Sequence, residues 1–424
     1  MVHTQETRRG LSRRRLVQAG LAAAALAGTG MSAACGAGGE DKNTWSFFSW
    51  DGKATMQPVL DLFHKQYPNL KVEFSNAPPV DQYISTLQTR LQANTAADVY
   101  IFTAENKQLA DGGFVKDLSG QAFLDVMNSA NRGFMTRDDK VWGLSISSWA
   151  GGILYNKALL AKVGASGLPD SWDGFLALCR KLKQAGITPY YDSVQDGNFM
   201  SLWGLLGGAF ADAGHFPDDD IFAGKTTFAA TWPDAVVAYS RLYTEGLVPK
   251  SVLGLTGDQV VSEFTNGRVA MFGAGTWNIP TIQKAAPKLQ FQTSAVPGLN
   301  AGTLYWSGAA SPGYAVNAKA KNAAAAMKFV KFMSTAPAVE AYAKASGSIT
   351  TTSNYQPTVD AALADFAKGA RSGKIYLPVV AWPKHANDLS TELKAQMQQM
   401  IQGKVAAKDI PGLLDKKLAQ LEGK

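Results

Sequence analysis

The sequence predicts an α/β fold divided into more than one domain. From residue 45 onward, short apolar runs typical of buried strands alternate with amphipathic stretches typical of helices. This alternation favours mainly parallel sheets with helices on both faces. The chain has 424 residues, which is more than one hydrophobic core usually serves. Hydrophobic residues make up 46% and charged residues 18%, so the composition is that of a globular chain.

Each expected element has a local signal. Strands are expected where apolar residues run together, over 45–50, 70–74, 98–102, 141–146, 153–155, 187–191 and 269–272. Helices are expected where apolar residues recur every three to four positions, over 56–67, 81–94, 172–184, 323–333, 386–401 and 410–421. Ser171, Asn322 and Thr276 are expected to cap the helices that follow them. Gly186 and Gly267 are expected to end helices, and a Gly-rich join is expected between 141–146 and 153–155.

The net charge does not favour nucleic-acid binding. The formal charge is +7, but five arginines and one glutamate in residues 1–34 account for +4 of it. The remaining +3 is an ordinary surface charge with no dense basic stripe for phosphates. We therefore expect no nucleic-acid partner.

The first 34 residues read as a signal peptide. A basic region precedes an apolar run over 16–27 and then small residues. The arginine pairs Arg8-Arg9 and Arg13-Arg14 resemble the twin-arginine export signal. An ordinary Sec signal with extra positive charge is the alternative. No later stretch has 18 continuous apolar residues, so no membrane span is expected.

Cys35 ends a stretch that resembles a bacterial lipobox, with Ser32 at the position where leucine is usual. Acylation of Cys35 would anchor the protein to the outer face of the bacterial cell membrane through a flexible tether over 35–43. The alternative is a cleavage site followed by an incidental free thiol. The other cysteine, Cys179, lies in an apolar helical stretch and is expected to be a small buried hydrophobe.

Four segments, taken in order, resemble the extracellular solute-binding proteins of ABC importers, specifically the carbohydrate-binding branch that includes maltose-binding proteins. They cover 97–118, 141–172, 264–277 and 323–347. The resemblance implies a two-lobed, type II periplasmic-binding-protein-like fold with a hinge and a ligand cleft between the lobes. It implies membrane permease subunits as partners, no enzymatic activity, no cofactor and no metal. We also expect a monomer.

The same resemblance implies the boundaries of the lobes. The chain is expected to cross between them near 148–151, near 305–309 and after Phe332. The first lobe would then consist of 44–148 plus 309–333, and the second of 149–305 plus 334–424.

A sugar site needs aromatic rings and hydrogen-bonding side chains on loops at strand ends. A pyranose presents an apolar C–H face that an indole covers, and a rim of hydroxyls that carboxylates and amides bind. Candidates at expected strand ends, crossings and loops are Trp50, Asp51, Glu105, Asn106, Trp149, Asn198, Trp277, Trp306 and Trp382. Any of these tryptophans can instead be a packing residue, and Asp51 and Glu105 can be helix caps. Trp203, at helical spacing, belongs either to the site or to the core.

Two rival functions use similar residues. A secreted glycoside hydrolase needs only two suitably spaced carboxyl groups, although the sequence has no Gly-x-Ser-x-Gly or His-Glu-x-x-His motif. A metal carrier is the second rival, because Tyr190-Tyr191 resembles paired iron-binding phenolates and Asp218-Asp219-Asp220 resembles a calcium ligand set. A strand end and a solvated turn are the favoured explanations of these two motifs. The sequence does not identify the sugar, and a peptide or polyol ligand stays open.

Overall fold

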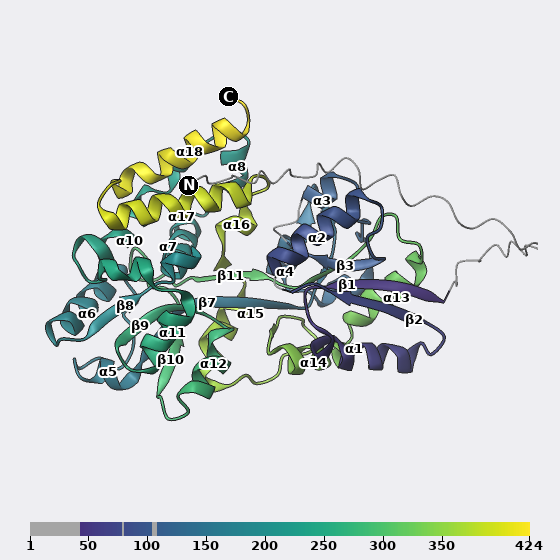
Figure 1. The fold of residues 1–424 in the computed structure, drawn as a ribbon, viewed down its shortest axis with the longest axis horizontal. Helices are drawn as coiled ribbons and strands as arrows, with labels where there is room; N and C mark the ends of the chain where they lie inside the picture. The colour runs from purple at the N-terminus through teal and green to yellow at the C-terminus, as the bar shows by residue number, and fades with distance from the viewer. Residues whose placement is uncertain (1–42, 79, 104–107) are drawn as a thin grey trace, which may run out of the picture. The chain divides into compact units, whose positions relative to one another are not determined.

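The structure is a computed structural model that describes residues 43–78, 80–103 and 108–424. These residues form two large mixed sheets, each with its own hydrophobic core, and we call the halves built on them the first lobe and the second lobe (Figure 1). The expected signal peptide, Cys35 and the tether up to residue 42 lie outside the described residues, as do Glu105 and Asn106.

The first lobe is built on a five-stranded sheet in the order β2-β1-β3-β12-β6. Its strands are β1 (Thr44–Ser49), β2 (Lys71–Asn76), β3 (Val99–Phe102), β6 (Leu144–Ser145) and β12 (Gly313–Val316). β1 runs parallel to β2 and β3, whereas β12 is antiparallel to β3 and β6. A separate two-stranded sheet joins β4 (Thr136–Arg137) and β5 (Lys140–Val141).

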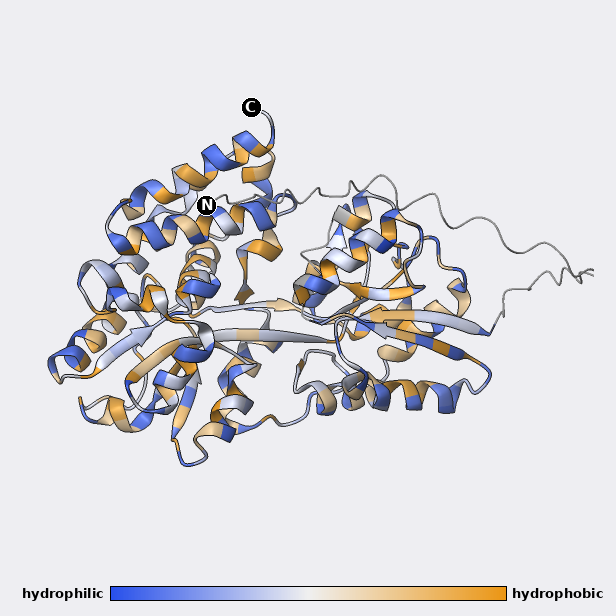
Figure 2. Cartoon of the chain, viewed as in Figure 1, coloured by the Kyte–Doolittle hydropathy of each residue, from blue (hydrophilic) through white to orange (hydrophobic). Residues whose placement is uncertain are grey.

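Helices cover both faces of this sheet, as Figure 1 shows for α1 and α14 on one side and α2 on the other. The helices of the lobe are α1 (Lys53–Gln66), α2 (Val80–Gln92), α3 (Gln108–Asp111), α4 (Ser129–Phe134), α13 (Ala323–Met333) and α14 (Ala336–Ser346). Trp45 and Phe47 of β1 pack on Phe329 of α13, with ring centroids 4.7 and 5.1 Å apart. Outer helices such as α1 carry both hydrophilic and hydrophobic residues (Figure 2), and the buried residues of α1 are Met56, Val59, Leu60 and Phe63.

The second lobe is built on a sheet in the order β14-β11-β7-β9-β8, with β10 and β13 also paired to β7. Its strands are β7 (Ser147–Asn156), β8 (Thr188–Tyr191), β9 (Val269–Gly275), β10 (Phe291–Ser294), β11 (Trp306–Ala310), β13 (Ile349–Thr350) and β14 (Ile375–Tyr376). β7 is antiparallel to β9, β10, β11 and β13. The expectation of mainly parallel sheets is therefore wrong for this lobe, because apolar runs reveal strands but not their direction.

The helices of the second lobe lie on both sides of its sheet, with α7, α10, α17 and α18 on one side in Figure 1. They are α5 (Lys157–Ala161), α6 (Trp172–Gln184), α7 (Met200–Asp212), α8 (Asp218–Phe222), α9 (Phe228–Thr231), α10 (Pro233–Thr244), α11 (Gly257–Thr265), α12 (Asn278–Ala285), α15 (Ala364–Ser372), α16 (Pro378–Ala381), α17 (Ala386–Gln402) and α18 (Ile410–Leu421). Among the helices within the described residues, none is both long and apolar enough to span a bilayer.

Several local predictions are confirmed. α6, α13 and α18 have the predicted bounds. The side chains of Ser171 and Asn322 accept hydrogen bonds from backbone N–H groups in the first turns of α6 and α13. The cap expected of Thr276 is wrong: Trp277 occupies the N-cap of α12, and the side chain of Asn278 accepts from the N–H of Gly275.

The expected Gly-rich join is instead the middle of one strand. β7 is continuous through Gly151 and Gly152, because these residues let its neighbours approach closely. A Cβ on Gly152 would overlap the carbonyl oxygen of Ser294 on β10 and press on the ring of Phe366. Glycine here therefore serves sheet packing rather than a chain turn.

The third crossing lies later than expected. Val339 and Tyr342 of α14 belong to the core of the first lobe, whereas the sequence analysis assigned 334–424 to the second lobe. Ile349 of β13 belongs to the second core and β13 pairs with β7, so the chain crosses after α14 and not after Phe332. A helix with one apolar face gives no signal of which lobe it covers.

Gly152→Ala is expected to lower the free energy of unfolding by about 1–3 kcal/mol, because the added methyl has no space in the sheet. The matched control is Gly412→Ala, where a Cβ in α18 meets nothing within 4 Å. It should leave stability unchanged or raise it by about 0.5–1 kcal/mol. Urea unfolding measures both, and equal stability of the two variants would contradict the packing role of Gly152.

Candidate functional site

A cavity of about 740 Å³ lies between α2 of the first lobe and several segments of the second lobe. We call it the aromatic pocket. Aromatic and apolar side chains dominate its lining, with a few polar groups among them. Its lining residues are Val80, Trp149, Gly197, Asn198, Phe199, Met200, Trp203, Trp277, Leu377, Pro378, Val379, Ser390 and Leu393.

Two tryptophans form one side of the aromatic pocket. The rings of Trp149 on β7 and Trp277 at the start of α12 meet edge to face, with centroids 5.2 Å apart and planes at 67°. The Trp277 side chain is 49% exposed, which is unusual for so large an apolar group. Its ring lies over Gly275, where a Cβ would overlap it. The pair therefore presents indole surface to whatever enters the pocket.

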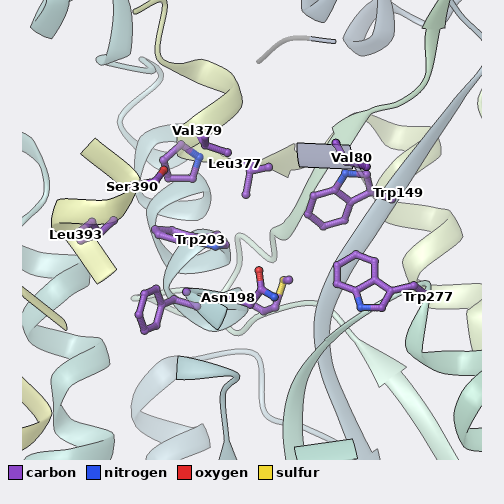
Figure 3. A pocket seen from close by; sticks show the side chains of 13 residues that line it. Val80, Trp149, Asn198, Trp203, Trp277, Leu377, Val379, Ser390 and Leu393 are labelled. Atoms are coloured by element: carbon purple, nitrogen blue, oxygen red, sulfur yellow. The ribbon is translucent and has the colours of Figure 1, made fainter. Parts of the chain in front are cut away.

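Asn198 and Trp203 lie across the pocket from this pair (Figure 3). Trp203 is on α7, and its ring contacts Phe199 edge to face at 5.8 Å. The half-buried Asn198 lies in the turn before α7, and its side-chain amide has no hydrogen-bond partner among the described residues. An amide free to donate and accept, beside aromatic faces, suits a ligand with both apolar and hydroxyl surfaces.

The start of α7 is held from behind by a buried carboxylate. Asp192 is fully buried, and it accepts hydrogen bonds from the hydroxyls of Tyr190 (2.6 Å) and Tyr239 (2.7 Å). It also accepts from the backbone N–H of Met200, whose side chain lines the pocket. Burial raises the pKa of Asp192 to about 7, although these hydrogen bonds act in the opposite direction. A Cβ on Gly273 would overlap this carboxylate, so the glycine makes room for it.

Three of the predicted ligand residues line the aromatic pocket: Trp149, Asn198 and Trp277. Trp306 and Trp382 do not. Trp306 is 3% exposed and donates from Nε1 to Asp365 at 3.0 Å. Trp382 is 2% exposed and stacks on Trp232 with centroids 6.0 Å apart. The structure places both rings in the core of the second lobe, so we leave them out of the proposed site.

Trp50 and Asp51 also lie apart from the aromatic pocket. Trp50 contacts the ring of Tyr83 edge to face at 5.6 Å. Asp51 accepts a hydrogen bond from Tyr342 of α14 at 3.0 Å, and burial raises its pKa to about 6. Asp51 thus ties the end of the first strand to α14 within the first lobe. Glu105 and Asn106 lie outside the described residues, so they stay predictions.

The sequence analysis did not select the apolar lining residues Phe199, Met200 and Leu377, nor Ser390 of α17. It left Trp203 between site and core, and the structure gives it both roles: it is 7% exposed and its ring lines the pocket. Within the described residues no group of three or more His, Cys, Asp or Glu side chains is placed to hold a metal ion.

Two α/β lobes with a ligand-sized aromatic pocket lined from both are the architecture of a two-lobed solute-binding protein. The chain belongs to the family of bacterial extracellular solute-binding proteins, whose family profile matches residues 49–340. The family is one of binding proteins, and the resemblance stated from the sequence is confirmed.

Named relatives agree with this assignment. The chain is 25% identical over 349 residues to the multiple sugar-binding protein of Streptococcus mutans serotype c, covering 80% of this chain and 82% of the relative. A family 1 extracellular solute-binding protein from Bifidobacterium longum subsp. infantis shares 30% identity with a TM-score of 0.81, covering 89% of this chain and 99% of that one. The raffinose complex of the binding protein RafE shares the fold, at 23% identity with a TM-score of 0.70, covering 89% and 99% of the two chains.

Asp192→Asn is expected to reduce the pH dependence of stability. Burial raises the folded-state pKa of Asp192, so its protonated carboxyl adds to the free energy of unfolding. This contribution is fully present below the unfolded-state pKa and is lost as pH rises from about 4 through about 7. The variant lacks this titration, so the free energy of unfolding of the native protein should fall relative to the variant by a few kcal/mol across that window. Urea unfolding at pH 4 to 8 measures it.

The control is Asp388→Asn, which removes an exposed carboxyl in the first turn of α17 and should keep the native pH profile. If the free energy of unfolding changed with pH in the same way for the native protein and Asp192→Asn, the raised pKa of Asp192 would be contradicted.

Proposed function

We propose that the protein captures a carbohydrate outside the cytoplasm and delivers it to the membrane permease of an ABC importer. The observation that carries this proposal is the aromatic pocket, in which the Trp149–Trp277 pair faces Trp203 and the free amide of Asn198. The family assignment supports the transport role.

The chemistry of the lining suits a sugar. An indole covers the C–H face of a pyranose with a large contact area and few rotamers to immobilise. Asn198 and Ser390 offer neutral donors and acceptors to ring hydroxyls. A cavity of about 740 Å³ has the size of a small-molecule site. The sugar-binding relative in Streptococcus mutans and the raffinose complex of RafE support the same ligand class.

The amino-terminal segment supports the location. We propose that residues 1–34 direct export, by the twin-arginine route that Arg13-Arg14 resembles, and that acylated Cys35 anchors the mature protein to the outer face of the cell membrane. A monomer on this anchor would exchange sugar with the permease by lobe closure and reopening.

A thermal-shift screen tests the ligand class. A ligand that binds only the folded protein raises its melting temperature, by an amount that grows with ligand concentration over Kd. The screen would include mono- to tetrasaccharides, polyols and short peptides. Shifts by sugars alone support the proposal. Shifts by peptides or polyols alone, or release of smaller sugars during incubation, would replace it with a different solute or with a glycoside hydrolase.

Trp277→Ala is expected to weaken binding of the best sugar at least tenfold, because the exposed indole is lost from one side of the pocket. Its melting temperature without sugar should change little, since half of the side chain is already in water. Isothermal titration calorimetry measures the affinity.

The control for this experiment is Trp142→Ala. Trp142 is a half-buried indole of the first lobe outside the aromatic pocket, and it donates from Nε1 to the carbonyl of Arg137 at 3.1 Å. It should keep the native affinity. Equal losses in the two variants would argue against the pocket as the sugar site.

Cys35→Ser is expected to abolish lipid attachment and to move the protein from the membrane to the soluble fraction of the producing bacterium. Cys179→Ser is the matched control, because Cys179 is buried in α6 and cannot be acylated in the folded protein. Mass spectrometry of the mature protein reports the lipid. An unmodified Cys35 in the native protein would contradict the anchor.

A further inference from the structure

A second hollow, of about 480 Å³, adjoins the aromatic pocket. We call it the polar groove. Its lining shares Gly197 and Ser390 with the aromatic pocket, so the two hollows are neighbours at that edge. Helix α2 of the first lobe and α17 of the second lobe form its walls. From these and the turn before Gly197 come Ile84, Ser85, Gln88, Asp196, Asn387, Thr391 and Lys394.

The chemistry of the polar groove differs from that of the aromatic pocket. Its lining contains hydroxyl, amide and charged groups and, among the described residues, no aromatic ring. The side-chain amides of Gln88 and Asn387 and the ammonium of Lys394 have no hydrogen-bond or ion-pair partner among the described residues. Asp196 is already engaged, because its carboxylate accepts from the N–H of Gly257 at 2.9 Å. The groove therefore offers unused polar groups on both walls.

Lys394 of the polar groove packs against the turn that both hollows share. Its aliphatic stem lies against Gly197, where a Cβ would come within 3.1 Å of the lysine Cδ. Gly197 has φ +76°, a conformation that suits glycine, and it lines both hollows. Glycine at position 197 thus lets the Lys394 stem pack closely against the turn that lines both hollows.

The two lobes contribute unequally to the two hollows. Among the described residues that line the aromatic pocket, only the apolar Val80 comes from the first lobe. The polar groove takes Ser85 and Gln88 from the same helix. Within the described part of the chain, the aromatic pocket therefore has hydrogen-bonding side chains from the second lobe, whereas the groove has them from both lobes.

A ligand moves a conformational equilibrium only as far as it binds one state better than the other. Groups on both walls can be bound at once only when the walls are at the right separation. We propose that the polar groove is an outer subsite for further sugar units, and that hydrogen bonds to α2 in this subsite make lobe closure depend on the length of the sugar. This inference rests on the proposed function and names the ligand as an oligosaccharide.

The test uses sucrose, raffinose and stachyose, because each member of this series extends the previous one by one galactose. The affinity of the native protein should rise at least tenfold from sucrose to stachyose. Small-angle X-ray scattering should show a smaller radius of gyration with stachyose than with sucrose at saturation. In Gln88→Ala, stachyose should bind about three- to tenfold more weakly, as expected for one lost hydrogen bond, while sucrose binding changes less than twofold.

Gln92→Ala is the matched control, since Gln92 is an exposed glutamine at the end of α2 that does not line the groove. It should behave as the native protein. Lys394→Ala tests the opposite wall and should likewise weaken stachyose more than sucrose.

Each other outcome is decisive. Equal affinity for the three sugars, or an equal loss for all of them in Gln88→Ala, overturns the outer subsite. A length-dependent affinity with an unchanged radius of gyration overturns the link to closure. If none of the three sugars binds, the groove assignment is overturned, and the thermal-shift screen decides separately whether the carbohydrate assignment stands.

Discussion

The site depends on how closely its neighbours approach β9. A Cβ at Gly273 would overlap the carboxylate of Asp192, and one at Gly275 would overlap the indole of Trp277. These two positions lie two residues apart in one fully buried strand. The absence of a side chain at Gly273 therefore leaves room for the Asp192 carboxylate, which holds the start of α7. The absence of one at Gly275 leaves room for the Trp277 ring on the exposed side of the pocket. A side chain at either position would displace one of them.

This arrangement makes the second lobe the carrier of the aromatic pocket. The Trp149–Trp277 pair and α7 belong to elements built on the sheet of the second lobe, with β7 at its centre. The first lobe adds Val80 to the pocket and the polar face of α2 to the neighbouring groove. Stacking and amide contacts are thus available before the lobes close, and contacts across the groove only when α2 is close enough. This sequence of contacts is the one that ligand-driven hinge closure requires.

Local structure was largely predictable from the sequence, and long-range placement was not. The bounds and N-cap of α6 follow from Ser171 and the apolar spacing after it. Trp149 was selected at an expected crossing between the lobes, and Trp277 beyond an expected strand end. Trp306 also lies at an expected crossing, yet it is buried, and its Nε1–H is bound by Asp365, 59 residues away. Whether a tryptophan lines a ligand site or packs in the core depends on such partners, which lie far away in the sequence. The direction of β7 and the lobe of α14 escaped prediction for the same reason.

Asp192 shows why a costly residue is compatible with the fold. A fully buried carboxylate lowers stability at neutral pH, as its raised pKa indicates. Two tyrosine hydroxyls and the N–H of Met200 offset part of that cost, and the Tyr190 hydroxyl also lies 2.6 Å from Ser201 Oγ in the first turn of α7. Because Met200 and Trp203 on this helix line the pocket, the network fixes the wall opposite the Trp149–Trp277 pair. An apolar residue at position 192 would remove the burial cost, but the start of α7 would lose its anchor. The fold thus tolerates the burial cost of Asp192 because this carboxylate positions the helix that lines the pocket.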